Sequence, residues 1–128
     1  RHSVEICSFI RHKTVDESKK LLEEVIIGKR AVPFRRYNKN IGHRKGKIAS
    51  GRFPKKASMY ILNLVKNVES NAKNLGLSTP LVISEIIANK GVRNWHAGRI
   101  RRIKHKSTHI KITVKELKKE EKTGEKKK

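Results

Sequence analysis

Apolar residues recur at steps of three and four between residues 54 and 75, and this is the most regular pattern in the chain. The period is that of an α-helix with one apolar face. The apolar positions are Ala57, Ile61, Leu64, Val65, Val68, Ala72 and Leu75. Pro54 suits the first turn, because the first amides of a helix have no partner within it, and Gly76 ends the pattern. The spacing predicts a helix over 54–75, whose polar face carries Lys66, Asn67, Ser70 and Asn74.

A second helix is predicted over 14–27 by its start signal and its apolar stripe. Thr14 and Glu17 have the spacing of a capping box, in which the Thr14 hydroxyl accepts from the Glu17 amide and the Glu17 carboxylate reaches back. The stripe consists of Val15, Leu22, Val25 and Ile26, and Gly28 supplies the stop.

Three segments have the pattern of β-strands. Residues 3–10 alternate, with Val4, Ile6 and Ile10 on one side. Residues 81–88 are apolar and β-branched, and residues 109–117 alternate between apolar and polar side chains. The length of the chain is that of one domain, which we place over 1–117.

The remaining segments show no regular period. Residues 29–53 are compatible with a short helix at 31–37 and then a loop over 38–53. Residues 89–108 have no apolar pattern that could pack into a core. A segment of this length without regular structure is unusual inside a compact domain unless it is functional. We therefore expect a protruding basic arm there, formed as a hairpin that extends the last two strands. Residues 118–128 contain no apolar residue and are expected to be a disordered tail.

Positive charge is abundant and unevenly distributed. The chain has 33 Lys and Arg against 11 Asp and Glu, a formal net charge of +22. Residues 25–68 contain 12 basic residues and no acid, and residues 86–115 contain nine and no acid. The helix at 14–27, by contrast, has four acids and two lysines. Two acid-free zones indicate an anionic partner, and the commonest polyanion in cells is nucleic acid.

Several residues in these zones favour RNA over a generic polyanion. Tyr37 follows two arginines and precedes an asparagine, so a stacking ring lies among guanidinium and amide groups, although burial is its alternative role. Arg52, Lys55 and Lys56 surround the start of the long helix, where free amides favour phosphate. The candidate RNA-binding residues of the first zone are Arg30, Arg35, Arg36, Tyr37, Asn38, Lys39, His43, Arg44, Lys45, Lys47, Arg52, Lys55 and Lys56. Those of the arm are Lys90, Arg93, Asn94, Trp95, His96, Arg99, Arg101, Arg102, Lys104 and Lys106.

Other classes of function have little support. The six histidines are scattered with no carboxylate-rich cluster beside them, so we expect no catalytic residue, no metal site and no cofactor. Cys7 is the only cysteine, and no apolar run approaches the length of a membrane span. The start of the chain also lacks the apolar stretch of a secretory signal. A reducing, intracellular compartment is therefore expected.

Five strings resemble one ribosomal protein family. Ala31-Val32-Pro33-Phe34-Arg35-Arg36-Tyr37-Asn38 resembles a hallmark of the archaeal and eukaryotic branch of large-subunit family twenty-two, called seventeen in eukaryotes. Residues 51–57 resemble that family's entry into its long helix, and residues 67–72 resemble a stretch further along it. Residues 96–100 and 108–110 resemble the returning limb of its arm and the strand that follows. The resemblance runs in order through residues 1–117.

The resemblance implies an α+β fold in which helices pack on a small antiparallel sheet, with a long basic β-hairpin arm. The three strands predicted above would make this sheet three-stranded. It implies a structural constituent of the cytoplasmic ribosome that binds large-subunit rRNA near the outer mouth of the peptide exit tunnel. The arm would line the tunnel beside protein four and the nascent peptide, and no homo-oligomer is implied. Only five residues, 91–95, lie between Asn89-Lys90 and His96-Ala97-Gly98, where other family members have several more, so a shorter arm tip is expected.

The competing hypothesis is a non-ribosomal nucleic-acid packaging protein, such as an architectural chromatin factor. It would share the positive charge and could insert Trp95 between bases. Two features disfavour it: the chain shows no obvious dimer stripe, and the Arg-Arg-Tyr-Asn cluster at 35–38 suits irregular RNA better than a uniform groove.

Overall fold

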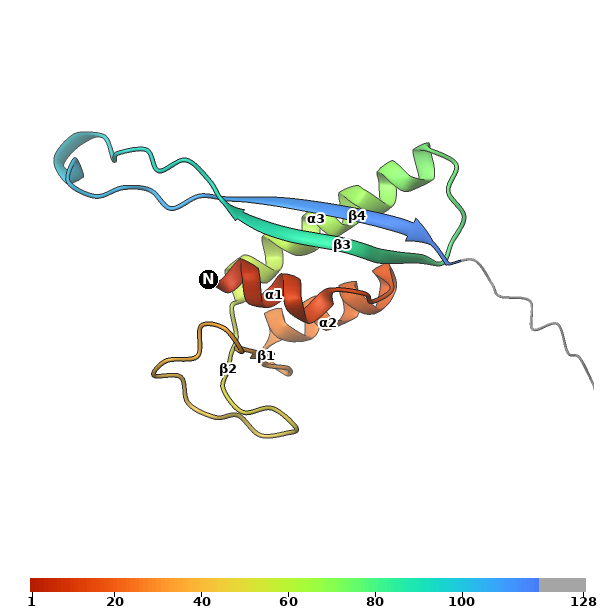
Figure 1. Cartoon of the computed structure of the whole chain (residues 1–128), viewed down its shortest axis with the longest axis horizontal. Helices are drawn as coiled ribbons and strands as arrows, with labels where there is room; N and C mark the ends of the chain where they lie inside the picture. Colours follow the sequence, from red (N-terminus) through yellow and green to blue (C-terminus); the bar gives the residue numbers. More distant parts are fainter. Residues whose placement is uncertain (118–128) are drawn as a thin grey trace, which may run out of the picture.

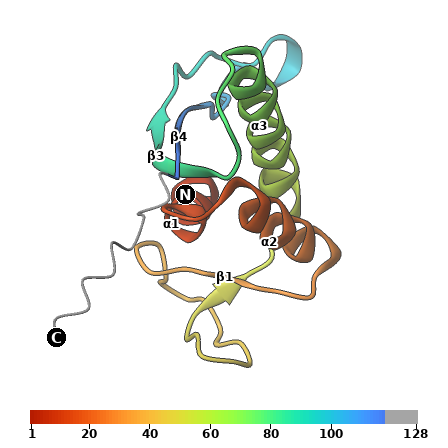
Figure 2. The ribbon, with the colours of Figure 1, turned by 90° about the vertical axis from the view of Figure 1, so that its right-hand side faces the viewer.

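The computed structural model describes residues 1–117 as three helices arranged around a long β-hairpin (Figure 1). The predicted tail at 118–128 lies outside the described residues. The elements are α1 (His2–Ile10), α2 (Val15–Ile27), β1 (Val32–Pro33), β2 (Gly51–Arg52), α3 (Lys55–Asn74), β3 (Leu81–Lys90), the 3₁₀ turn η1 (Gly98–Ile100) and β4 (Thr108–Glu116). In the orthogonal view, α3 runs alongside the hairpin and α1 and α2 pack below it (Figure 2).

The first segment is a helix, so the predicted strand at 3–10 is wrong. Ile6, Cys7 and Ile10 are buried on one face of α1, at the three- and four-residue spacing of a helix. Val4 and Ile6 also fit the two-residue period of a strand. Over so short a segment, periodicity alone does not distinguish a helix from a strand. The α+β class is correct, but the main sheet of the described residues has two strands, β3 and β4, in place of three.

The two longer helices confirm the helix predictions. Thr14 caps α2, since its hydroxyl accepts from the Glu17 amide at 3.2 Å. The reciprocal half of the capping box is absent, because the Glu17 carboxylate binds Lys13 Nζ at 2.6 Å. Gly28 ends α2 with φ 94°, a left-handed conformation that glycine adopts without strain. Pro54 precedes α3, whose inner face buries Ile61, Leu62, Val65 and Ala72.

The β3–β4 pair confirms the two later strands. It is antiparallel from Leu81↔Glu116 to Lys90↔Thr108, with one irregularity between Ile83 and Glu85. Side chains of β3, α1, α2 and α3 form the core, which is mainly aliphatic and also encloses Glu5, Ser18 and Ser58. Its fully buried members include Ile6, Ile10, Leu22, Val25, Ile61, Val65, Ile83 and Ile86. Within the described part of the chain, no helix is long and apolar enough to cross a membrane.

Residues 31–37 do not form the short helix that the sequence allowed, and a short β-pair is found there instead. Val32 of β1 lies opposite Arg52 of β2, and the Phe34 amide donates to the Ser50 carbonyl at 2.9 Å. Pro33 explains the outcome, because the residue before a proline is pushed toward extended conformations. The rest of residues 38–53 is the predicted loop, closed on itself by an isolated bridge between His43 and Ser50.

Residues 91–107 continue from the hairpin and project beyond the helices (Figure 1). The regular ladder ends at Lys90 and Thr108, so an arm that is β-hairpin throughout is not confirmed. The two limbs still contact each other: the His105 amide donates to Asn94 at 2.8 Å, the His96 amide donates to Ile103 at 2.9 Å, and Trp95 bridges Lys104. The segment bends through the single 3₁₀ turn η1 at its far end.

Candidate nucleic-acid interface

A buried carboxylate fixes the Arg-Arg-Tyr loop. Glu5, on α1, is only 2% exposed, and its two oxygens accept backbone N–H bonds from three consecutive residues. Oε2 accepts from Arg35 at 3.1 Å, and Oε1 accepts from Arg36 and Tyr37 at 2.9 Å each. Bonds from backbone amides to an ionised carboxylate are among the stronger hydrogen bonds in proteins. The backbone turns inward to Glu5, while the Arg35 and Arg36 side chains remain exposed.

Tyr37 has the burial that the sequence left open as its alternative role. Its ring is half-buried and packs on the core, which is the structural role. The Arg36 guanidinium lies 5.9 Å from the ring centre and that of Arg1 lies 5.8 Å from it, both within cation–π range. The ring is therefore held between cations with part of its surface open to solvent.

The loop at 38–50 presents most of the remaining predicted cations of the first zone. Lys39, Lys45 and Lys47 are exposed, as are Asn38 and His43. Arg44 is more constrained: its guanidinium lies 5.3 Å from the Phe53 ring centre, and its Nε donates to the Gly51 carbonyl at 3.3 Å. Arg44 thus links the loop to the strand that leads into α3.

The start of α3 has exposed cations and lacks an acidic residue or a side-chain cap. Arg52, Lys55 and Lys56 are all exposed there. Lys55 also has an intramolecular role, because a Cβ placed on Gly28 would lie 3.8 Å from its Nζ. Its ammonium therefore sits at the C-terminal end of α2, where helix carbonyls carry partial negative charge. Arg30 differs from the others, since its Nε binds the Glu24 carboxylate and its charge is partly compensated.

The arm carries its own set of exposed cations around two aromatic contacts. The Trp95 ring is 60% exposed, and Lys104 Nζ lies 4.2 Å from its centre. His96 and His105 stack across the two limbs with ring centres 3.3 Å apart. The other predicted cations of the arm are all exposed: Lys90, Arg93, Arg99, Arg101, Arg102 and Lys106.

A cavity of about 610 Å³ joins the two basic zones, which are far apart in sequence. Tyr37 contributes to it from the loop, Lys90 and Arg93 from the outgoing limb of the arm, and Lys106 from the returning limb. Asn89 adds an amide, and none of the lining residues is acidic. A space with cations, an aromatic ring and an amide matches the chemistry of a nucleotide.

His2 lines the same cavity and contributes a neutral ring. Burial lowers the pKa of His2, and nearby positive charge, including Arg52, lowers it further. The imidazole is therefore neutral at pH 7 and lies edge-on to the Phe34 ring, with centres 5.8 Å apart. It packs the loop against α1 without adding charge.

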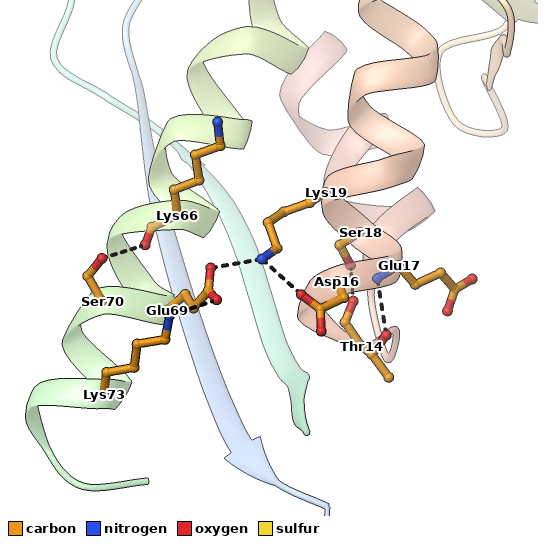
Figure 3. Close-up of polar contacts among 9 residues, drawn as sticks. All are labelled: Thr14, Asp16, Glu17, Ser18, Lys19, Lys66, Glu69, Ser70 and Lys73. Atoms are coloured by element: carbon orange, nitrogen blue, oxygen red, sulfur yellow. Dashed lines mark hydrogen bonds and ion pairs between the residues drawn. The ribbon is translucent and has the colours of Figure 1, made fainter. Parts of the chain in front are cut away.

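The carboxylates of the described residues lie away from these exposed cations or are already paired. Four of them are on α2, and Glu69 of α3 is held by Lys19 at 2.8 Å and Lys73 at 3.3 Å (Figure 3). Glu85 pairs with Lys111, and Glu116 accepts from the Ser78 amide. In the described part of the chain, no group of three His, Cys, Asp or Glu residues is placed to hold a metal ion. Few carboxylates of the described residues are therefore placed to compete with an external anion for the exposed cations.

Sequence reasoning missed Glu5, the residue that orders the loop. It lies in a segment predicted as a strand, and its partners are backbone amides about thirty residues further on, which no side-chain pattern encodes. One signal was present: Glu5 is an isolated acid within an otherwise apolar stretch.

Comparison with known proteins decides the family. The family model described as ribosomal protein L22p/L17e matches residues 1–115. This chain belongs to the L22p/L17e family. The resemblance drawn from the strings at 31–38, 51–57 and 96–100 is thereby confirmed. The family is one of ribosomal proteins, not of enzymes, in agreement with the expected lack of a catalytic site.

Individual archaeal relatives carry the name large ribosomal subunit protein uL22. That of Archaeoglobus fulgidus is 47% identical over 94 residues, covering 71% of this chain and 61% of the relative. That of Nanoarchaeum equitans is 42% identical over 126 residues, covering 92% and 72%. That of Methanosphaera stadtmanae is 42% identical over 123 residues, covering 89% and 79%. The chain thus spans about three fifths of the first relative and about three quarters of the other two.

Proposed function

We propose that this protein is a structural constituent of the large ribosomal subunit in the cytoplasm and that it binds and neutralises large-subunit rRNA. One observation carries the proposal: the cavity at the base of the arm brings cations of the second acid-free zone together with Arg1, the Tyr37 ring of the first zone and the Asn89 amide. Membership of the L22p/L17e family adds the ribosomal context.

In this mechanism, residues 1–117 act as one domain whose exposed cations offset RNA phosphates. Roughly ten to twenty such groups let RNA segments that repel one another pack side by side. Phosphate contacts position a protein without reading sequence, so the loop held by Glu5 acts mainly as a shaped positive surface. Arg35 and Arg36 of this loop are exposed, as are Arg52 and Lys56 at the start of α3.

For residues 90–106, the proposal is insertion into the RNA so that the arm lines the peptide exit tunnel. Its exposed arginines and lysines would bind the tunnel RNA. Trp95 and the exposed Ile100 and Ile103, 53% and 56% exposed, would face protein four or the nascent peptide. These partners follow from the family and not from a feature of the arm alone.

The test of this function is a double variant, Arg35→Ala with Arg36→Ala. The backbone amides that bind Glu5 remain, so the fold is kept while two exposed charges are lost. We expect reduced large-subunit levels in sucrose gradients and an unchanged unfolding midpoint of the purified protein. Lys20→Ala, on the mixed-charge helix α2, is the control and should assemble normally. Normal subunit levels in the double variant would overturn the assignment of this loop.

A further inference from the structure

The outer face of α3 carries several side-chain amides, with Ser70 between two of them. Asn63, Asn67 and Asn74 are exposed on the side of the helix opposite the buried Ile61 and Val65. Asn71 is exposed beside them, so four of the eight asparagines in the chain lie on this one helix. The family assignment and the two basic zones leave this surface without a role.

Folding does not account for this choice of residue. Asparagine is among the less favourable helix formers, because its short amide competes for backbone hydrogen bonds. On an exposed face, where packing imposes nothing, alanine, lysine or glutamate would stabilise the helix better. A face that keeps several asparagines at a cost in helix stability indicates that their donors and acceptors are used by a partner.

The charges around the amides select an anionic partner. Lys56, Lys66 and Lys73 are exposed on the same helix. Its only acid, Glu69, is directed toward Lys19 of α2 and bound by it (Figure 3). The amide face therefore presents hydrogen-bonding groups and cations, with no free carboxylate to repel a phosphate.

We propose that the outer face of α3 docks against the minor groove of a double-helical segment of large-subunit rRNA. The minor groove of A-form RNA is wide and shallow, and it displays 2′-hydroxyls that both donate and accept, as the asparagine amide does. Lys56 and Lys66 would reach the flanking phosphates. With 20 residues, α3 is about 30 Å long, enough to follow a groove rather than touch one nucleotide. This inference rests on the proposed function and names the RNA element that one surface recognises.

A protein partner is the alternative and is less favoured. Protein interfaces are enriched in aromatic residues and methionine at their centres. On α3, Met59 and Tyr60, 51% and 62% exposed, lie near the first turns, and the asparagines occupy the middle and the end. The amide-rich part of the helix therefore has the wrong composition for such a centre.

A cleavage reagent tethered to α3 tests the proposal directly. Cys7 is buried and burial raises the pKa of its thiol to about 11, so a new exposed cysteine reacts selectively. An iron chelate attached to Asn67→Cys in the full chain, reconstituted into large subunits, generates radicals next to the outer face. Ala49→Cys, exposed in the basic loop, is the matched control.

The pattern of cuts separates the hypotheses. Cuts on both strands of a paired rRNA segment from Asn67→Cys support the proposal. Cuts from Ala49→Cys alone overturn it and leave the proposed function standing, and a protein crosslinked at position 67 would then identify a protein neighbour. If neither probe cuts rRNA, the proposed function itself fails.

A binding measurement with Asn63, Asn67 and Asn74 all changed to Ala gives an independent test. Alanine favours the helix, so weaker binding is not explained by unfolding. We expect roughly tenfold or more loss of affinity for an RNA duplex of about two turns and little change for the same DNA duplex. The slope of log affinity against log salt concentration should equal that of the unmodified chain, because no charge is removed. Equal losses of affinity for RNA and DNA, or no loss for either, would contradict the proposal. The control is the double variant Lys20→Ala, Glu23→Ala, which leaves the net charge unchanged.

Discussion

Oε1 of Glu5 lies 2.9 Å from the backbone nitrogen of Arg36 and accepts its hydrogen bond. The same carboxylate binds the amides of Arg35 and Tyr37, so a buried group of α1 sets the path of the loop that carries the two adjacent arginines. Hydrogen bonds to a buried side chain thus hold the backbone of this loop, and no partner is needed to set its shape.

Glu5→Gln should therefore destabilise the protein. The amide group of glutamine points a donor at backbone donors, which removes at least one charge-assisted bond at a buried position. We expect the free energy of unfolding to fall by about 2 kcal/mol, measured by urea denaturation. Glu23→Gln, exposed on α2, should change it by less than about 0.5 kcal/mol. Equal effects in the two variants would mean that the Glu5 contacts contribute nothing.

The ion pairs between α2 and α3 should make stability depend on acid pH. The hydrogen bond from Lys19 lowers the pKa of both Glu69 and Asp16, whose ordinary values are 4.5 and 3.8. A lowered folded-state pKa stabilises the fold above the ordinary value, and that contribution is lost as the pH falls through the lowered one. Lys19→Met should cost about 0.5–1 kcal/mol at pH 7, since these side chains are partly exposed.

The difference between Lys19→Met and the unmodified chain should shrink as the pH falls below about 4 and vanish near pH 2. It should persist on the alkaline side, because hydrogen bonds to Asp16 and Glu69 raise the pKa of Lys19 above its ordinary 10.5. Urea denaturation at a series of pH values measures this. A difference independent of pH between 2 and 7 would show that Lys19 acts through packing and not through its charge.

Ser58 offers a substitution that should stabilise the protein. Its hydroxyl oxygen is buried on the inner face of α3 with no hydrogen-bond partner among the described residues. Ser58→Ala removes this desolvated group and improves helix propensity, so the free energy of unfolding should rise by about 1 kcal/mol. A decrease in thermal or urea stability would show that the hydroxyl has a partner in solution.

Cys7 should resist thiol reagents while the protein is folded. Burial raises the pKa of the thiol from 9.0 to about 11, so very little thiolate exists at pH 8. Alkylation should be at least about 100-fold slower than for the urea-unfolded chain. Comparable rates in the two states would mean that the core around α1 opens readily.

Sequence patterns predicted the longer elements and missed those set by distant contacts. The repeats of α3 and the alternation of β4 are long enough to identify one period, and both elements end within about two residues of prediction. Nine residues of α1 are too few for that, and the strand predicted there was wrong. Pro33 could have excluded a helix at 31–37 through its restriction on Val32.

The candidate interface was predictable in its charges and not in its geometry. The absence of acids marked both basic zones, and the string at 31–38 indicated the family. The pairing of Arg30 with Glu24, the position of Lys55 beside Gly28 and the shared cavity of Tyr37 with Lys106 all depend on tertiary contacts. Such contacts join residues that no local pattern relates.

Ultraviolet crosslinking in growing cells, followed by sequencing of the attached RNA, tests the central claim most directly. We expect reads at a few discrete sites of large-subunit rRNA, some of them lining the exit tunnel, with the protein sedimenting in large subunits. Reads scattered over many transcripts, with the protein on chromatin, would contradict it and favour a packaging protein.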